Sequence, residues 1–383
     1  MSKPSESTSM LALAESLRNQ VADLDGRLKH NSVSPPSLAV GASTELWSSQ
    51  PDDIENIRSS IFGITKQLTK LLQGPHEFLH EYVSPNWEHG ALYTLLEFNV
   101  LEQIPLHGPA HVSFLASRCG LHEKKLLSML RLISCEEIIK ETSEGEFCHT
   151  AISEDLVRDE KFKAWVGFQL FETRIASANL ADSMKANVCD YQEGPSAFKY
   201  AWGSSMYDWH RMHPEKSARF RMAMEGVTRS LDPGNTLYKA WFKSSSSRRP
   251  TSVVDVGGRN IGFLSAEFPA FNFETQADNF EPPRVQTANE RRLVYLIRNI
   301  LWNYSDADCI KMLRAYVPIL ERAENAMLLI NEMISPALGT FATHVEKGYR
   351  RRDVTVMTMH NAKQRTEAEW RDLFTRANEN FTV

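Results

Sequence analysis

Four short apolar segments, separated by helical stretches, constrain the last third of this chain more than any other feature. Each segment has the length of one buried strand, and the four lie at Val253–Val256, Phe271–Thr275, Leu293–Ile297 and Ala326–Ile330. The sequence around them predicts helices at Phe263–Phe268, Asp306–Leu320 and Thr366–Ala377. Strands that alternate with helices favour a parallel, doubly wound sheet.

A glycine turn follows the first predicted strand, which runs into Asp255, Val256, Gly257 and Gly258. Glycines let the backbone approach a ligand closely. Ligands of such folds bind at the carboxyl ends of the parallel strands. The turn therefore predicts a site for a nucleotide-like ligand. The motif is short, so the neighbouring motifs decide how specific this prediction is.

The N-terminal region carries two amphipathic helical patterns. Apolar residues recur at steps of three and four over Met10–Leu28 and again over Ile54–Leu71, and the second helix is expected to end at Gly74–Pro75. The intervening Asn31–Gln50 is rich in Ser, Pro and Gly and predicts a linker. Both apolar faces must be covered, either by a partner subunit or by the rest of the chain. The sequence leaves these two alternatives open.

A winged-helix pattern follows. An apolar helix is predicted at Leu92–Leu101, a helical pair at Val112–Cys119 and Lys124–Ile133, and a small β-wing from Glu137–Lys140 and Glu146–Thr150. Winged helices often bind DNA, but the helical pair leaves little basic surface and the net charge of the chain is −5. We interpret the module as a dimerisation domain.

The stretch from Gly194 to Ser230 is predicted to be helical and is rich in large apolar side chains. Ordinary core packing explains most such stretches. An apolar pocket for a flat organic substrate is the alternative, because aromatic and methionine side chains line such pockets. The candidate pocket residues in this stretch are Trp202, Met206, Tyr207, Trp209 and Met224. A polar hinge, Lys243–Ser252, precedes the predicted sheet.

Composition excludes several classes of function. The net negative charge argues against nucleic-acid and anionic-membrane partners, and no apolar run reaches the length of a membrane span. The five cysteines are scattered without a C-x-x-C pair, which argues against a disulfide framework and a zinc site and favours reduced thiols. The N-terminus is polar and lacks the apolar core of a signal peptide. We therefore expect a cytoplasmic protein without a metal ion.

Six motifs in order carry a family resemblance: LLSMLRLISCEEIIKE, FKYAWGSSMYDW, VVDVGG, YLIRNILWNYSDADC, LLINEMISP and HNAKQRTEAEW. From about Trp87 to its end the chain resembles the plant- and fungal-type class I O-methyltransferases, which use S-adenosylmethionine (SAM). The last motif is as similar to fungal members as to plant members, which favours a fungal secondary-metabolite pathway.

The resemblance implies a mainly α fold joined to an α/β domain. It divides the chain into an N-terminal helix and linker (residues 1–50), a winged-helix dimerisation domain (51–155), a helical substrate-binding region (156–245) and a Rossmann-like methyltransferase domain (246–383). It also implies a homodimer and a small natural-product substrate, with Met357, three residues before the last motif, and Asn361 within that motif beside the substrate pocket. The chain ends where the family continues into its last pair of strands, so we expect a shortened sheet.

The cofactor positions that the resemblance implies are Asp255, Gly257, Gly258, Asp278, Asn279 and Arg298, the last at the place of a SAM-contacting lysine. The loop departs from the family pattern, because Arg259 and Ile261 stand where the family has glycines. Gln276 and Ala277 supply no carboxylate for the ribose of SAM, and the segment that follows is short. SAM is therefore a candidate cofactor whose binding we expect to be weak or absent.

The position of the catalytic base differs most from the family pattern. Trp302 aligns with the histidine that removes a proton in the family, and an indole cannot accept a proton near neutral pH. One of the two flanking glutamates matches as Glu332, whereas the other is Gln364. Arg298, Asn303 and, if it faces the pocket, Arg131 are candidate hydrogen-bond donors to a substrate carbonyl.

Three functions follow from this pattern. The first is a repurposed enzyme that catalyses dehydration or ring closure in the old pocket, as leporin-type pericyclases of this family do, since such chemistry needs positioning and a donor but no base. The second is an O-methyltransferase that works by proximity of SAM and acceptor. The third is a catalytically inactive subunit that dimerises with an active relative.

Overall fold

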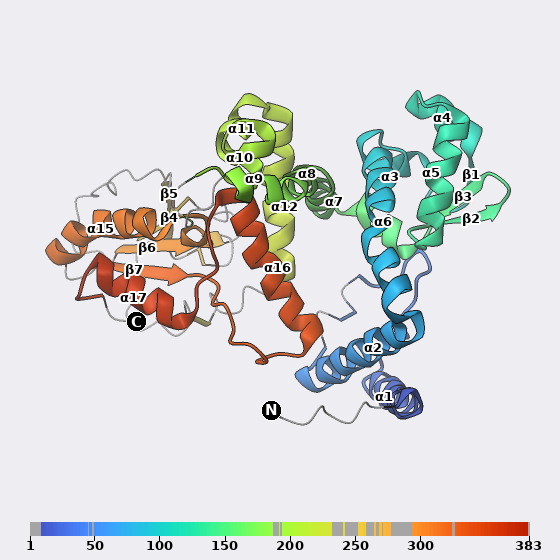
Figure 1. The fold of residues 1–383 in the computed structure, drawn as a ribbon, viewed down its shortest axis with the longest axis horizontal. Helices are drawn as coiled ribbons and strands as arrows, with labels where there is room; N and C mark the ends of the chain where they lie inside the picture. The colour runs from blue at the N-terminus through green and yellow to red at the C-terminus, as the bar shows by residue number, and fades with distance from the viewer. Residues whose placement is uncertain are drawn as a thin grey trace. The chain divides into compact units, whose positions relative to one another are not determined.

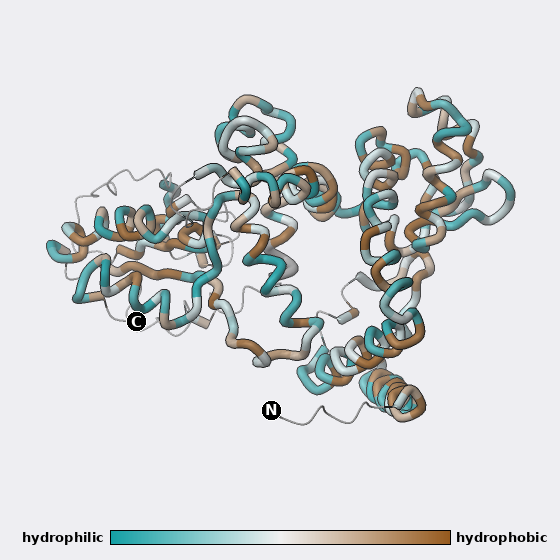
Figure 2. The backbone as a smooth tube through the Cα atoms, in the orientation of Figure 1, coloured by the Kyte–Doolittle hydropathy of each residue, from teal (hydrophilic) through white to brown (hydrophobic). Residues whose placement is uncertain are grey.

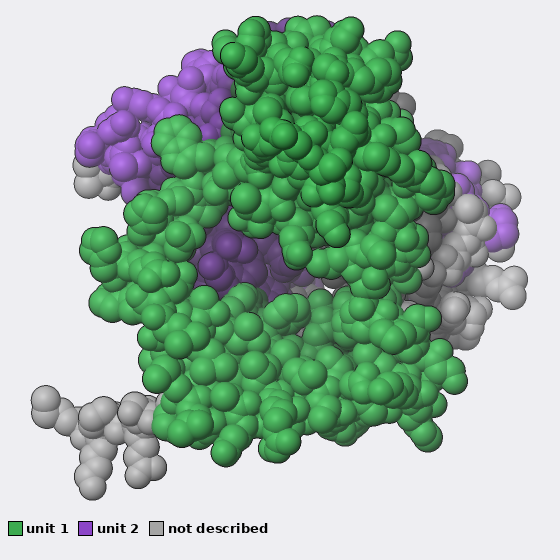
Figure 3. All heavy atoms as spheres, turned by 90° about the vertical axis from the view of Figure 1, so that its right-hand side faces the viewer, with its two compact units in different colours: residues 1–171, 219–227, 341–346 green, residues 172–218, 228–340, 347–383 purple. Residues whose placement is uncertain are grey.

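A computed structural model of the chain describes residues 9–44, 46–47, 50–186, 191, 194–231, 240–241, 252–257, 264–265, 268–269, 271–276, 293–323 and 326–381. The chain forms two compact units (Figure 3). Unit 1 comprises Met1–Phe171, Arg219–Val227 and Phe341–Glu346. Unit 2 comprises Glu172–Ala218, Thr228–Thr340 and Lys347–Val383.

Unit 1 begins with two packed helices, α1 (Met10–His30) and α2 (Asp52–Val83) (Figure 1). The expected break of the second helix at Gly74–Pro75 is confirmed. Gly74 leaves the helical conformation (φ 66°, ψ 178°), and a further helical segment, which the sequence did not predict, continues from Pro75 to Val83. Proline breaks the helix by losing its N–H and clashing with the preceding turn, and the glycine absorbs the resulting kink.

The winged-helix prediction is confirmed in the rest of unit 1. Its elements are α3 (Asn86–Glu97), η1 (Leu101–Gln103), β1 (Ala110–His111), α4 (Val112–Cys119), α5 (Glu123–Cys135), β2 (Ile139–Ser143) and β3 (Glu146–His149). The strands pair antiparallel in the order β1-β3-β2. Gly120 ends α4 in the left-handed conformation, which glycine adopts without strain. Leu115, Leu126 and Phe147 are fully buried in the core between helices and wing.

In the sequence, a series of helices follows the wing and precedes the strands of the sheet. They are α6 (Ala151–Arg158), α7 (Glu160–Phe168), a π-helical turn η2 (Gln169–Thr173), α8 (Arg174–Ala178), α9 (Leu180–Ala186), α10 (Ala197–Trp202), α11 (Met206–Met212) and α12 (Pro214–Leu231). Within unit 1, α12 approaches α7 closely at Gly226, where any side chain would meet the backbone of Lys161.

Gly226→Ala is therefore expected to destabilise unit 1. The added Cβ would lie 2.5 Å from the carbonyl oxygen of Lys161, so the two helices must separate. We expect a loss of about 1–3 kcal/mol in the free energy of unfolding, measured in denaturant. The matched control is Gly63→Ala in α2, where nothing lies within 4 Å. There alanine should stabilise the helix by up to about 1 kcal/mol, and an equal loss in both variants would contradict the close approach.

Unit 2 contains a parallel four-stranded sheet of β4 (Ser252–Val256), β5 (Asn272–Gln276), β6 (Leu293–Arg298) and β7 (Ala326–Asn331). The order β5-β4-β6-β7 places β4 and β6 in the centre, where their side chains are buried on both faces. Figure 2 shows β6 and β7 as hydrophobic along most of their length. The predicted mainly α plus α/β fold with a parallel sheet is confirmed.

Helices α15 (Asp306–Arg322) and α17 (Glu367–Ala377) cover one face of this sheet, where Tyr295 and Ile297 pack against Leu313 and Trp370. Val253, Val294 and Leu296 point to the other face, against Leu264. The predicted helix at Phe263–Phe268 lies largely outside the described residues. The sequence did not predict α16 (Thr343–His360), because its charged residues interrupt any apolar stripe.

Candidate functional site

The loop between β6 and α15 presents Trp302 and Asn303 at the carboxyl end of the sheet. Asn299 turns the chain with a left-handed backbone (φ 52°), and Leu301–Asn303 form the short 3-10 helix η4. Ser305 then caps α15 by accepting a hydrogen bond from the backbone N–H of Asp308 at 3.1 Å. Ligands of open α/β sheets bind at this edge, so the loop stands where substrate or cofactor is expected.

The indole of Trp302 is half-buried, and its Nε1–H donates a hydrogen bond to the carbonyl oxygen of Asn299 at 2.8 Å. An indole has one donor and no acceptor. Trp302 therefore neither removes a proton nor offers a free N–H to a ligand in this conformation. Asn303 and Arg298 are also half-buried, at the end of η4 and of β6 respectively.

Glu332 follows β7 and binds the backbone of the same loop. Its Oε1 accepts hydrogen bonds from the N–H groups of Ile300 and Leu301, both at 2.8 Å. Its Oε2 is buried and has no hydrogen-bond partner among the residues that the structure describes. Burial raises the pKa of this carboxyl group to about 7, against the lowering effect of the backbone N–H groups of residues 300–302 and of Arg365. Glu332 thus holds the loop and changes charge near neutral pH.

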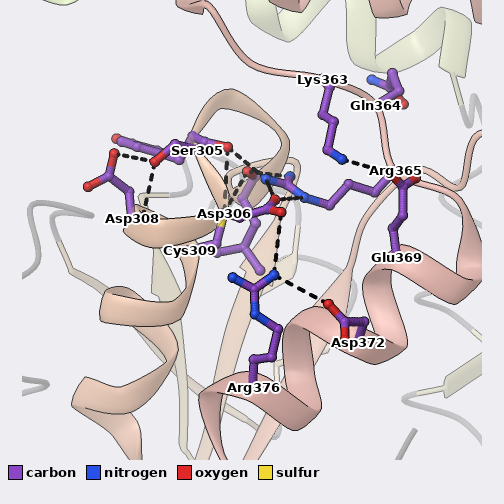
Figure 4. A network of polar contacts seen from close by, with 12 residues as sticks. Ser305, Asp306, Asp308, Cys309, Lys363, Gln364, Arg365, Glu369, Asp372 and Arg376 are labelled. Carbon is purple, nitrogen blue, oxygen red and sulfur yellow. Dashed lines mark hydrogen bonds and ion pairs between the residues drawn. The ribbon is translucent and has the colours of Figure 1, made fainter. Parts of the chain in front are cut away.

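Arg365 fixes the loop from the other side, although its side chain is only 1% exposed. Its guanidinium lies 2.6 Å from a carboxylate oxygen of Asp306 and donates to the carbonyl oxygens of Leu301 (3.3 Å) and Tyr304 (2.9 Å) (Figure 4). It also lies over the ring of Trp370, 4.9 Å from the centroid. Sequence reasoning missed this residue; its only signal was its place beside Gln364 in the last motif.

Gln364 is 8% exposed and lies in the segment between α16 and α17. Its backbone N–H donates to Asp353 at 2.8 Å. The side-chain Nε2 is buried and has no hydrogen-bond partner within the described part of the chain. In Figure 4 its side chain points away from the network around Arg365.

The cofactor end of the sheet is described only in part. Asp255 is buried in β4, and Gly257 turns the chain with φ 64° while its N–H donates to the carbonyl oxygen of Gln276 at 2.7 Å. The predicted cofactor residues Gly258, Asp278 and Asn279, and the substituted Arg259 and Ile261, lie outside the described residues. β5 ends at Gln276, and the carboxylate within this strand is Glu274, two residues earlier.

Three of the predicted pocket residues form an aromatic and apolar cluster within unit 2. The rings of Trp202 and Trp209 lie 4.8 Å apart, and Trp209 stacks on His213 at 4.2 Å. Met206 and Trp209 are buried, as core residues are. Met224 belongs to unit 1 and is not described with this group.

The other predicted pocket residues lie near the end of α16. Tyr207 stacks on the ring of His360 at 5.4 Å. The hydroxyl of Tyr191 lies 4.0 Å from the sulfur of Met357, and Nδ2 of Asn361 donates to the carbonyl oxygen of Tyr191 at 3.4 Å. Sequence reasoning also missed His360, whose burial lowers its pKa to about 4 and keeps the ring neutral.

One small pocket in unit 2 has a volume of about 40 Å³. It is lined by Tyr191, Tyr304, Ser305, Asp306, Ala362, Lys363 and Arg365. Organic ligands need pockets of about 300–1,000 Å³, so this one is too small for an organic substrate. Arg131, the conditional donor, forms an ion pair with Glu141 in the wing of unit 1 at 2.9 Å and does not belong to this site.

The described residues contain no cluster of three metal-ligating side chains. Among the same residues, none of the helices is long and apolar enough to cross a membrane.

Comparison with known proteins identifies the family. Residues 290–379 match the O-methyltransferase domain, which covers β6, the Trp302 loop, Glu332 and Arg365. The chain is 42% identical to O-methyltransferase phnC of Penicillium herquei over 99% of its own length and 97% of that protein. The chain belongs to the O-methyltransferase family. Its relatives include further fungal O-methyltransferases, in agreement with the resemblance.

Solved structures agree on the fold. The crystal structure of OxaC matches with a TM-score of 0.72 and 16% identity, over 96% of this chain and 94% of OxaC. A structure described as a pericyclic reaction enzyme matches with a TM-score of 0.67 and 18% identity, over 94% of both chains. OxaC has also been crystallised with S-adenosylhomocysteine and oxaline. The same fold thus occurs in a protein described as a pericyclic reaction enzyme and in a protein described as a mitomycin 7-O-methyltransferase.

Proposed function

We propose that this member of the O-methyltransferase family is a non-methylating cyclase of natural-product biosynthesis, which holds a small organic substrate for dehydration or pericyclic ring closure. The proposal rests on the residue at the position of the catalytic base, which is Trp302. It aligns with the base histidine of the family, its indole accepts no proton, and its N–H is bonded to Asn299. The neighbouring fold of a pericyclic reaction enzyme supports the same interpretation.

Ring closure of this kind depends on holding the substrate in a reactive pose and on polarising a carbonyl group. In the proposal, Trp302, Asn303, Glu332, Gln364 and Arg298 surround the reacting part of the substrate, and the aromatic cluster of unit 2 with Met357 and Asn361 binds its apolar part. The buried contacts of Arg365 keep the Trp302 loop in one conformation, so the loop needs no reorganisation when substrate binds.

A SAM-dependent O-methyltransferase is the second candidate, because a protein with that name is 42% identical over almost both full lengths. Asp255, Gly257 and Gly258, with Arg298, are then the proposed cofactor contacts. Arg259 and Ile261, at places where the family has glycines, argue against tight binding. A catalytically inactive dimer partner is the remaining alternative.

Methyl transfer decides between these functions. We expect no low-micromolar SAM binding in calorimetry, and no methylated product from pathway intermediates. Trp302→His combined with Gln364→Glu should also give no methylation, because the cofactor loop still carries Arg259 and Ile261. Methylated product from this double variant would show that the SAM site is intact and would overturn the proposal. Trp302→Ala should disturb product formation by a cyclase and leave an inactive partner unaffected.

We further propose that the protein is a homodimer. Large apolar side chains at the end of α2 and the start of α3 are exposed, among them Leu72 (73%), Val83 (68%) and Trp87 (71%). Exposed apolar patches of this kind mark protein interfaces. Sedimentation at micromolar concentration should give twice the monomer mass, and Leu72→Glu with Trp87→Glu should shift it to the monomer. A wild-type monomer would contradict the prediction.

A further inference from the structure

The imidazole ring of His360, the last residue of α16, has no hydrogen-bond partner within the described residues. Its recorded side-chain contact is the stacked ring of Tyr207, at 5.4 Å between centroids. A neutral imidazole carries one N–H donor and one acceptor nitrogen, and polar groups inside proteins are normally paired. Both nitrogens of His360 are therefore available to a bound molecule.

The stacked pair lies in a recess rather than in the core. Tyr207 is 36% exposed, and His360 and Met357 are half-buried. By contrast, Met206 and Trp209 of the same helix α11 are only 3% and 6% exposed. Protein nevertheless surrounds the imidazole closely, because burial alone lowers its pKa to about 4. A side chain that is enclosed by protein and still reachable from solvent lines a recess where a ligand can contact it.

This recess is connected to the Trp302 loop. Met357 and His360 are three residues apart on α16 and share one face of the helix. The hydroxyl of Tyr191 lies 4.0 Å from the sulfur of Met357. Tyr191 also lines the small pocket beside Tyr304, which follows η4 in the loop. Tyr191 thus joins the helix face of His360 to the loop that carries Trp302.

The chemistry of the two positions is complementary. The place of the family's histidine holds the indole of Trp302, whose N–H is bonded to Asn299. His360 supplies an imidazole that its burial keeps neutral above about pH 5. Such a ring is a weak base near neutral pH, but a neutral imidazole can polarise a carbonyl group through its N–H. These properties favour a hydrogen-bond donor over a proton acceptor.

We propose that His360 donates a hydrogen bond from its neutral imidazole to a carbonyl oxygen of the substrate and polarises that carbonyl during ring closure. This inference deepens the proposed function and rests on it for the presence of a substrate in unit 2. The stacked ring of Tyr207 holds the plane of the imidazole, so the donor is oriented before the substrate binds. The substrate class is a small apolar ketone, because aromatic and methionine side chains line the recess.

The affinity for a ketone relative to its matched hydrocarbon tests this donor. The probes are 1-tetralone and tetralin, and calorimetry measures their affinities for the full-length protein without SAM. The ratio of the two affinities should be about three- to tenfold higher in the wild type than in His360→Phe, as expected for one hydrogen bond. His360→Phe keeps a ring against Tyr207 and loses the donor. His360→Asn and His360→Gln place an amide N–H near the positions of Nδ1 and Nε2, and one of them should keep the higher ratio.

Two spectroscopic readouts need no variant. The infrared carbonyl stretch of 1-tetralone bound to the wild type should lie at a lower frequency than in cyclohexane, because a hydrogen bond weakens the C=O bond. In an NMR titration, the ring signals of His360 should not move between pH 5.5 and pH 8, because the imidazole is neutral throughout. A stacked ring with only a packing role would produce no shift of the carbonyl band.

The control is His122→Phe, at an exposed position before α5 where the side chain makes no capping hydrogen bond. It should keep the wild-type affinity ratio, and thermal unfolding checks that each variant is folded. The inference is overturned if the wild type does not bind 1-tetralone, if its affinity ratio equals that of His360→Phe, if the carbonyl band is unshifted, or if His360 titrates in this pH range. Methylated product would refute the proposed function instead, and these measurements without SAM would be unchanged by it.

Discussion

Arg365→Met is expected to lower the free energy of unfolding of unit 2 by about 2–3 kcal/mol, because it removes the buried guanidinium that pairs with Asp306 and leaves that carboxylate Arg376, at 3.7 Å, as its only ion-pair partner among the described residues. The change also removes two hydrogen bonds to the carbonyl oxygens of the Trp302 loop. Breaking one half of a buried ion pair costs more than the pair itself contributes. The expected readout is a large shift of the denaturant midpoint, with lost activity at temperatures where the variant is still folded.

The control lies in the neighbouring helix. Arg371 pairs with Glu367 on the surface of α17, where both side chains are more than half exposed. Arg371→Met should change the free energy of unfolding by less than about 1 kcal/mol. Adding Asp306→Leu to Arg365→Met should recover part of the loss, because the half-buried carboxylate that lost its nearest cation is then absent. Equal effects of Arg365→Met and Arg371→Met would show that the buried pair does not hold the loop.

Glu332→Gln is expected to remove a pH dependence from the stability of unit 2. The pKa of Glu332 is raised to about 7 in the folded state by burial, above its ordinary value near 4.5. The folded state therefore binds this proton more tightly than the unfolded state. The resulting stabilisation is complete below about pH 4.5 and is lost as the pH rises through about 7, by an amount on the order of 2–3 kcal/mol.

The measurement is the difference in unfolding free energy between the wild type and Glu332→Gln from pH 4.5 to pH 8. Other shifted groups, such as Glu369 (pKa about 2) and His360 (pKa about 4), titrate in both proteins and cancel in this difference. The difference should move in favour of the glutamine variant as the pH rises. Glu367→Gln on the surface of α17 is the control, with a difference that stays within about 0.5 kcal/mol. A flat difference for Glu332→Gln would contradict the buried carboxyl.

Periodicity predicted most of the fold. The helical pair Val112–Cys119 and Glu123–Cys135 and the four strands of the sheet have the apolar spacing that the sequence shows. The kinked second half of α2 and helix α16 escaped prediction for a local reason. Gly74–Pro75 ends the first helical segment as predicted, but Pro75 can also begin a new one, and α16 carries no continuous apolar stripe.

The candidate site was less accessible to the sequence. The motif gave Trp302, Glu332 and Gln364 as positions, but pairing between segments far apart in the chain decides what each side chain contacts. Nothing in the sequence places the indole N–H on Asn299 or buries an arginine at position 365. An arginine is usually exposed, and only the surrounding carbonyl groups and Asp306 make its burial favourable.

The division into two units has a consequence for genetic dissection. The chain passes from one unit to the other at residues 171–172, 218–219, 227–228, 340–341 and 346–347. No contiguous fragment therefore contains a whole unit without part of the other, and a truncation at any of these points leaves at least one unit incomplete. A chimera that takes its N-terminal half from a relative would place side chains from two different proteins in the core of each unit. To give a folded hybrid, an exchange of residues 1–171 with a relative must also exchange the parts of α12 and of the start of α16 that belong to unit 1.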